Sequence, residues 1–277
     1  MRGRIRIVGA MAAVAAVASA GVAGAVSQDF SVAPDGTGGA SPKCAKGKFA
    51  TGGGFTSSVN SAWDQNALGP RGRIFKVGLA DDSGDPQTGR AFALCKNKEP
   101  FKVARKRVEF EITAASRAVV KTVEARCPRG TKLAGGGYTT TSPDSDSAYV
   151  LESKPAGRSW RLKTTQTVVG SYVLRARALC DERPRADYEV VKDALSEQAG
   201  RTRARRGLGG ILNLTLEPEC AGNDRPTAGG YASTGDFKPR WSTIAPQQGG
   251  YLLKAKQGFG PGGLPEGDII GYALCRT

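Results

Sequence analysis

Three copies of one pattern run along the chain and use all six of its cysteines. Each copy holds a cysteine, a glycine run closed by an aromatic residue, a second aromatic residue and a final Ala-Leu-Cys. The glycine runs are Gly52-Gly53-Gly54-Phe55, Gly135-Gly136-Gly137-Tyr138 and Ala228-Gly229-Gly230-Tyr231. Because each copy has similar residues to bury, the chain is expected to fold as a repeat of one structural unit. The pattern describes an architecture and contains no chemistry of its own.

The cysteine spacing favours one disulfide within each unit. An even number of cysteines in an exported chain indicates a disulfide framework, and six cysteines allow 15 pairings. Pairing within units gives three loops of nearly equal length, whereas pairing between units leaves the first and last cysteines far apart in the sequence. We therefore expect Cys44–Cys95, Cys127–Cys180 and Cys220–Cys275.

The first 25 residues have the features of a secretory signal peptide. Arg2, Arg4 and Arg6 precede a stretch rich in Ala, Val and Gly, and Ala23-Gly24-Ala25 offers a cleavage site. An uncleaved anchor is the alternative, but so many small residues hold a bilayer weakly, so we expect no stable membrane insertion after cleavage. The mature protein is expected to be secreted.

Strand patterns predict an all-β fold. Leu212, Leu214 and Leu216 alternate with polar residues, as the residues of a half-buried antiparallel strand do. Residues 27–42 are rich in Gly, Pro, Ser and Asp and have little to bury, which predicts a flexible lead-in. Residues 35–43 lack apolar alternation, so the first unit is expected to lack the strand before its first cysteine. The expected divisions are a signal peptide (1–25), a lead-in (26–43) and three β modules (44–100, 101–187 and 188–277). The main expectation is three tandem disulfide-stapled antiparallel modules, and the alternative is a single prism-like domain with pseudo-threefold symmetry.

The recurring glycines and aromatic residues have a structural and a functional interpretation. Glycine is costly inside a strand, so the runs predict either a bulge or corner, or a groove where a ligand meets bare backbone. The recurring aromatic positions are interpreted as core: Phe55, Phe75, Tyr138, Trp160, Tyr231 and Tyr251. A less regular set, Trp63, Tyr149 and Trp241, is the candidate for stacking on a sugar ring.

The chain contains no histidine, which excludes Ser-His-Asp catalysis, Cys-His catalysis and histidine metal sites. Paired cysteines would also remove thiolate nucleophiles and Cys-ligated zinc. We expect no catalytic residue, metal or cofactor. Asp81, Asp82 and Asp85 are the calcium candidate, although their spacing does not match an EF-hand loop. A secreted hydrolase that uses loop carboxylates is the alternative function, although no spacing fixes a facing pair.

Basic residues dominate the charge, with a formal net charge of +15. Two clusters occupy corresponding positions between units: Lys102, Arg105, Lys106 and Arg107, and Arg201, Arg203, Arg205 and Arg206. Matched cationic loops can contact one anionic polymer at several points. The partners expected are an anionic envelope polymer or polysaccharide and, non-specifically, nucleic acid. The competing interpretation is a pair of solvated linkers whose charges protect strand edges.

The second unit, with Cys127-Pro-Arg-Gly130 and Ala178-Leu-Cys180, resembles repeated modules of functionally uncharacterised secreted proteins from high-GC Gram-positive bacteria. In the third unit Ala228 replaces the first glycine, and the first unit lacks proline after Cys44. The resemblance implies secretion and a β-rich, disulfide-linked unit. It carries over no functional residues.

Overall fold

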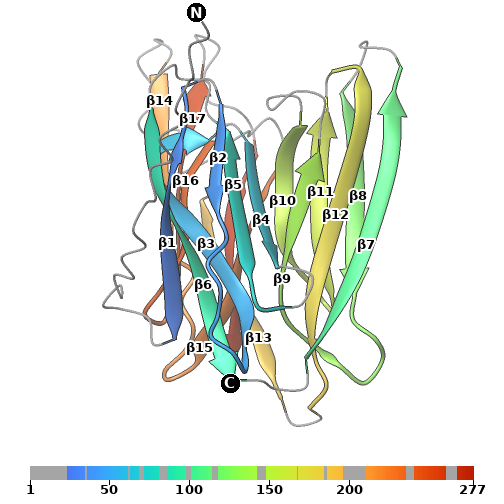
Figure 1. Cartoon of the computed structure of the whole chain (residues 1–277), viewed down its shortest axis with the longest axis vertical. Helices are drawn as coiled ribbons and strands as arrows, with labels where there is room; N and C mark the ends of the chain where they lie inside the picture. The colour runs from blue at the N-terminus through green and yellow to red at the C-terminus, as the bar shows by residue number, and fades with distance from the viewer. Residues whose placement is uncertain are drawn as a thin grey trace, which may run out of the picture.

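The fold is entirely β in the part of the chain that the structure describes. This computed structural model describes residues 24–34, 36–61, 63–68, 72–80, 86–97, 101–113, 118–141, 148–166, 168–183, 186–195, 210–234, 240–259 and 267–277. They form eighteen strands that run along the long axis of the molecule (Figure 1). The all-β prediction is confirmed. Within these ranges no helix has the length and apolar character needed to cross a membrane.

Each unit contributes six strands in the same order. The first unit supplies β1 (Ala25–Val32), β2 (Thr37–Ala40), β3 (Lys48–Ser61), β4 (Trp63–Leu68), β5 (Phe75–Ala80) and β6 (Gln87–Asn97). The second supplies β7 (Phe101–Ile112), β8 (Val119–Arg126), β9 (Lys132–Thr141), β10 (Ala148–Ala156), β11 (Ser159–Gln166) and β12 (Gly170–Asp181). The third supplies β13 (Tyr188–Leu195), β14 (Gly210–Leu216), β15 (Arg225–Ser233), β16 (Arg240–Gln247), β17 (Gly250–Phe259) and β18 (Ile269–Arg276).

The units exchange strands in a cyclic manner to build three six-stranded sheets. Sheet I has the order β1-β6-β3-β16-β17-β14, sheet II the order β13-β18-β15-β10-β11-β8, and sheet III the order β2-β5-β4-β9-β12-β7. Each sheet therefore joins three strands of one unit to three strands of another. This cyclic sharing corresponds to the prism-like, pseudo-threefold arrangement that the sequence left open as the alternative. The units are disulfide-stapled β structures, as expected, but they interlock instead of standing apart.

The segment expected to be a flexible lead-in is a pair of strands, so that expectation is corrected. β1 pairs with β6 along its whole length, and β2 pairs with β5. In β1 the Phe30 ring packs over Gly89 of β6. In β2 a Cβ on Gly39 would lie 2.3 Å from the carbonyl oxygen of Val77, so close backbone approach requires glycine here. Both are edge strands, which are held by backbone pairing to one neighbour and do not need the apolar alternation that the sequence lacks here.

The glycine runs mark a β-bulge, which confirms their structural interpretation. The register between the glycine strand and the last strand of each unit shifts by one residue at Thr51, Ala134 and Thr227. The Thr227 hydroxyl donates to the Leu274 carbonyl oxygen at 2.9 Å, and the Thr51 hydroxyl makes the equivalent bond to Leu94 at 3.4 Å. A bulge bends a strand and increases its twist. The three bulged strands, β3, β9 and β15, meet one another inside the prism.

The middle glycine of each run lies beneath an aromatic ring of its own unit. A Cβ on Gly136 would lie 2.1 Å from the Trp160 ring, and one on Gly229 would lie 2.1 Å from the Tyr251 ring. Gly53 has the same relation to Phe75. In every unit the ring comes from a different sheet from its glycine. The glycines therefore let a large ring bridge two sheets.

The aromatic core prediction is confirmed, and one candidate for sugar stacking is wrong. All six recurring aromatic side chains are buried, each with at most 2% of its surface exposed. Trp241, a stacking candidate, is also buried, because its ring packs at 4.6 Å on Tyr231. Tyr149 is half-buried, and the side chain of Trp63 lies outside the described part of the chain.

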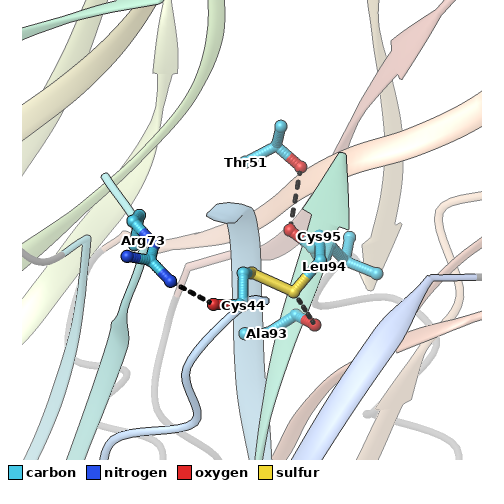
Figure 2. The surroundings of a disulfide bond; sticks show 6 residues. All are labelled: Cys44, Thr51, Arg73, Ala93, Leu94 and Cys95. Carbon is cyan, nitrogen blue, oxygen red and sulfur yellow. Dashed lines mark hydrogen bonds between the residues drawn. A yellow bond between two sulfur atoms is a disulfide. The ribbon is translucent and has the colours of Figure 1, made fainter. Parts of the chain in front are cut away.

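The three expected disulfides are all present, with sequence separations of 51, 53 and 55 residues. Each bridge ties the segment before the glycine strand to the last strand of the same unit. The Cys127 bridge, for example, joins the residue after β8 of sheet II to β12 of sheet III. Figure 2 shows the Cys44–Cys95 bridge, where the Arg73 guanidinium donates to the Cys44 carbonyl oxygen at 3.2 Å. Each disulfide thus links two neighbouring sheets of the prism.

Candidate functional site

The first predicted basic cluster lies in a strand, which corrects its interpretation as a loop. Residues 102–107 belong to β7, the edge strand of sheet III (Figure 1, right). Successive side chains of a strand point to opposite faces, so the cluster is divided. Arg105 and Arg107 lie on the outer face, whereas Lys102 and Lys106 lie on the opposite face at the edge. The second predicted cluster, Arg201, Arg203, Arg205 and Arg206, lies outside the described residues.

Two further arginines join Arg105 and Arg107 on the outer face of sheet III. In the pairing of β7 with β12, Arg105 lies opposite Arg177 and Arg107 lies opposite Arg175. The alternating residues of β12, such as Leu174 and Ala176, are buried, which places Arg175 and Arg177 on the outer face. We call these four residues, Arg105, Arg107, Arg175 and Arg177, the arginine cluster.

The strand geometry sets the spacing within the arginine cluster. Directly opposite residues of an antiparallel pair have Cα atoms about 4.5–5.5 Å apart. Residues two apart along a strand are separated by about 7 Å. Four guanidinium groups therefore extend from the corners of a small rectangle. Such a group can donate paired N–H bonds to a phosphate or a carboxylate.

Electrostatic repulsion within the arginine cluster is evident at Arg177. Burial lowers the pKa of its guanidinium, and the positive charges of Arg105 and Arg175 lower it further. Like charges directly opposite each other in a sheet are destabilising. Glu109 forms an ion pair with Arg107 at the border of the arginine cluster. The fold thus places several cations next to one another on this face.

The equivalent positions on the other two outer faces do not carry four cations. On sheet I, Arg90 is equivalent to Arg175, and Asp29 of β1 lies opposite it at 2.5 Å in an ion pair. On sheet II, Tyr272 is equivalent to Arg177 and lies under the ammonium groups of Lys154 and Lys192. The arginine cluster is therefore a property of one unit and not of the repeat.

The sequence reasoning found half of the arginine cluster and missed the other half. Arg175 and Arg177 lie in the strand that leads to Cys180, and not between units, where the basic clusters were expected. The signal that reveals them is the motif Arg175-Ala-Arg177, which mirrors Arg105-Lys-Arg107 with the same spacing of two. Only the register of β7 with β12 brings the two motifs together.

Two buried carboxylates of the described chain are ion-paired and lie on different sheets. Asp181 of β12 accepts hydrogen bonds from Arg183, and the Tyr188 hydroxyl donates to it at 2.7 Å. Burial opposes the ionisation of Asp181, but these hydrogen bonds outweigh it and lower its pKa. Glu152 of β10 lies 3.2 Å from the Lys154 ammonium group. Among the described residues no three acidic or cysteine side chains gather as metal ligands.

The chain matches no protein-family model and no curated protein.

Proposed function

We propose that the protein is a secreted, non-enzymatic binding or structural protein of the cell envelope or extracellular space. The arginine cluster, in this proposal, binds anionic polymers. The observation that carries it is the placement of Arg105, Arg107, Arg175 and Arg177 on one outer face. Guanidinium groups match phosphate and carboxylate oxygens in two-point contacts, and they stay charged at any physiological pH.

A polymer suits this surface better than a small anion does. The arginine cluster lies on an outer sheet face, so a long chain can cross it and continue in both directions. The full sequence has a formal net charge of +15, and the mature protein, without Arg2, Arg4 and Arg6, keeps about +12, which attracts such chains from a distance. Repeated weak contacts along one polymer reinforce each other.

Secretion is supported by the three disulfides, because such bonds persist in oxidising compartments. The basic and apolar beginning of the sequence is interpreted as the export signal. N-terminal sequencing of the protein from culture medium tests this part of the proposal. A start near residue 26 is the expected result, and retention inside the cell with an intact Met1 would contradict it.

The binding proposal is tested with three immobilised anionic polymers: cell-wall polymer, heparin and DNA, each at low and at moderate salt. The protein is expected to be retained at low salt and released as salt rises. The variant Arg105→Gln/Arg107→Gln should bind the polymers at least about tenfold more weakly than the wild type does. The matched control is Arg161→Gln/Lys163→Gln, which removes two cations with the same spacing from β11 of sheet II. No retention of the wild type on any polymer would overturn the proposal.

A carboxylate-based hydrolase is the second function that the sequence left open, and no observation favours it. The calcium candidates Asp81, Asp82 and Asp85, which are among the loop carboxylates of the chain, lie outside the described residues. A general acid needs a raised pKa, whereas the pKa of buried Asp181 is lowered.

A further inference from the structure

A polar pocket lies at one end of the prism, between the first and third units. It has a volume of about 970 Å³. Its walls come from the end of β6, the turn that precedes β15, the turn between β16 and β17, and the end of β18. Figure 1 shows this end at the bottom, where the β6 arrow and the C-terminal label meet. The pocket lies within the volume range of small-molecule sites, roughly 300–1,000 Å³.

The polar side chains of this end pocket have hydrogen-bonding capacity to spare. Five of them make no hydrogen bond or ion pair with any other described residue: Asn97, Asn223, Arg225, Gln247 and Gln248. All five carry an amide or guanidinium group and lie in a turn or at the end of a strand, and all are exposed except Gln247, which is half-buried. Polar groups gathered in a pocket without protein partners are available to a ligand or to water.

A hollow of sheet I, lined by residues of β1, β3 and β6, provides the contrast. It measures about 650 Å³ and is also lined by polar groups. There, however, the Asp29 carboxylate binds Arg90, and the Ser58 hydroxyl donates to Gln87 at 2.9 Å. Because these groups already satisfy one another, binding a ligand would require breaking existing bonds. In the end pocket, the five side chains named above have no such bonds to break.

The charge of the end pocket selects the class of ligand. Arg225 lies opposite Arg276 in the ladder between β15 and β18. Lys96 adds a third cation to the lining, against one acidic side chain, Asp224. The site is therefore net positive. An anionic group on the ligand would be attracted, and a guanidinium can bind a carboxylate or a phosphate in a two-point contact.

The amide groups of the end pocket favour a ligand that carries hydroxyl groups besides its anionic group. An amide side chain carries both donors and an acceptor, and a sugar hydroxyl is likewise donor and acceptor. Asn97, Asn223 and Gln248 thus offer partners to a ligand with several hydroxyl groups. Gly222 and Gly249 shape the two turns with φ values of 52° and 85°. No atom of the described residues lies within 4 Å of a Cβ built on Gly222 or Gly249, so the turns leave the mouth of the pocket open.

We propose that the end pocket binds an acidic saccharide, a sugar unit that carries a carboxylate or a phosphate. Arg225 contacts the acidic group, and the amides of Asn97, Asn223 and Gln248 contact the hydroxyls. This site goes beyond the proposed function, because it uses none of the residues of the arginine cluster and recognises a single sugar unit instead of a polymer surface.

Calorimetric titration of the full mature protein tests the proposal. The probes are sodium glucuronate and glucose 6-phosphate, with glucose and inorganic phosphate as controls. Saturable binding of at least one acidic sugar is expected, with glucose and phosphate each at least about tenfold weaker. The two acidic probes distinguish a carboxylate from a phosphate. No saturable binding of either acidic sugar, or equal binding of glucose, would overturn the proposal.

Variants localise the binding to the end pocket. Arg225→Ala should weaken the acidic sugars at least about tenfold, and Gln248→Ala should weaken them by about threefold to tenfold. Gln248 is an exposed turn residue, so its variant keeps the test valid if Arg225→Ala folds poorly. The matched control is Arg129→Ala, in the corresponding turn of the second unit. Unchanged affinity in both pocket variants would overturn the proposal.

The two proposals fail independently. The variant Arg105→Gln/Arg107→Gln should lose polymer binding and keep the affinity for acidic sugars. Arg225→Ala should lose affinity for acidic sugars and keep polymer binding. Loss of sugar binding in the Arg105→Gln/Arg107→Gln variant would contradict a separate site.

Discussion

The hydroxyl oxygens of Tyr138 and Tyr231 lie 3.1 Å apart in the buried interior, where the second unit meets the third. Both rings close a glycine run, and both are almost completely buried. The equivalent residue of the first unit is Phe55, which has no hydroxyl group. This hydrogen bond therefore joins the second unit to the third, and Phe55 cannot form its equivalent with either tyrosine.

Replacing either tyrosine with phenylalanine should destabilise the protein. Phenylalanine fits the position, as Phe55 shows, so Tyr138→Phe should remove a hydrogen bond without creating a large cavity. The expected loss in the free energy of unfolding is about 1 kcal/mol, measured by urea denaturation. In a double-mutant cycle, Tyr138→Phe and Tyr231→Phe should be coupled by about 1 kcal/mol.

Tyr172→Phe provides the control for this cycle. The Tyr172 hydroxyl donates to the Val168 carbonyl oxygen at 2.7 Å within the second unit, away from Tyr231. Its effect should add to that of Tyr231→Phe. If the losses in the free energy of unfolding caused by Tyr138→Phe and Tyr231→Phe were also additive, the two hydroxyl groups would not interact.

The middle glycines should not tolerate alanine. A Cβ at position 136 would lie 2.1 Å from the Trp160 ring, so Gly136→Ala forces the ring or a sheet to move. Overpacking of this kind costs about 1–3 kcal/mol in the free energy of unfolding. The opposite change in the third unit, Ala228→Gly, should cost about 1 kcal/mol at most, because no side chain needs to move. Equal costs for the two variants, measured by thermal or urea unfolding, would contradict the packing role of the middle glycine.

Tyr188→Phe should make the protein more sensitive to acid. The folded-state pKa of Asp181 is lowered, so its carboxylate stabilises the fold above the ordinary aspartate pKa of about 3.9. This contribution is lost as the pH falls through the folded-state pKa. Removing the Tyr188 hydroxyl, 2.7 Å from the carboxylate, should raise the pKa of Asp181 and shift acid unfolding to higher pH.

Carbon-13 NMR titration of the Asp181 carboxyl group measures this pKa directly. Tyr172→Phe again serves as the control, since its hydroxyl donates to a backbone carbonyl and not to a carboxylate. If the acid-unfolding midpoint of Tyr188→Phe matched that of the wild type, the hydrogen bond from Tyr188 would not set the pKa of Asp181.

The repeat pattern predicted the local structure of the units well. Cysteine spacing specified the three disulfides, and the recurrence of aromatic residues such as Trp160 and Tyr251 indicated the core. These features are set within a unit, so they can be read from one copy and checked against the others. The strand β1 was missed because its Ser27, Gln28 and Asp29 are polar on both faces. Its pairing with β6 depends on backbone hydrogen bonds, which leave little trace in the sequence.

The exchange of strands between units could not be predicted from the sequence. The contact of β10 with β15 rests on two paired positions, Glu152 with Ala232 and Ser153 with Tyr231. Neither pair of residues has a chemical feature that would identify the contact in the sequence. The arginine cluster was half-predicted for the same reason, because the register of β7 with β12 is a tertiary property. Basic residues were visible in the sequence, but their shared face was not.

The salt dependence of polymer binding should report on the arginine cluster. For single-stranded DNA, each neutralised phosphate contributes about 0.7 to the slope of log K against log salt concentration. With a fluorescent oligothymidine as probe, Arg105→Gln/Arg107→Gln should reduce the slope by about 1.4 if both arginines contact phosphates. The control Arg161→Gln/Lys163→Gln should leave the slope nearly unchanged, because both residues lie in β11 of sheet II, outside the arginine cluster. Equal reductions in the two variants would mean that the polymer responds to net charge alone, and that the outer face of sheet III is not its binding site.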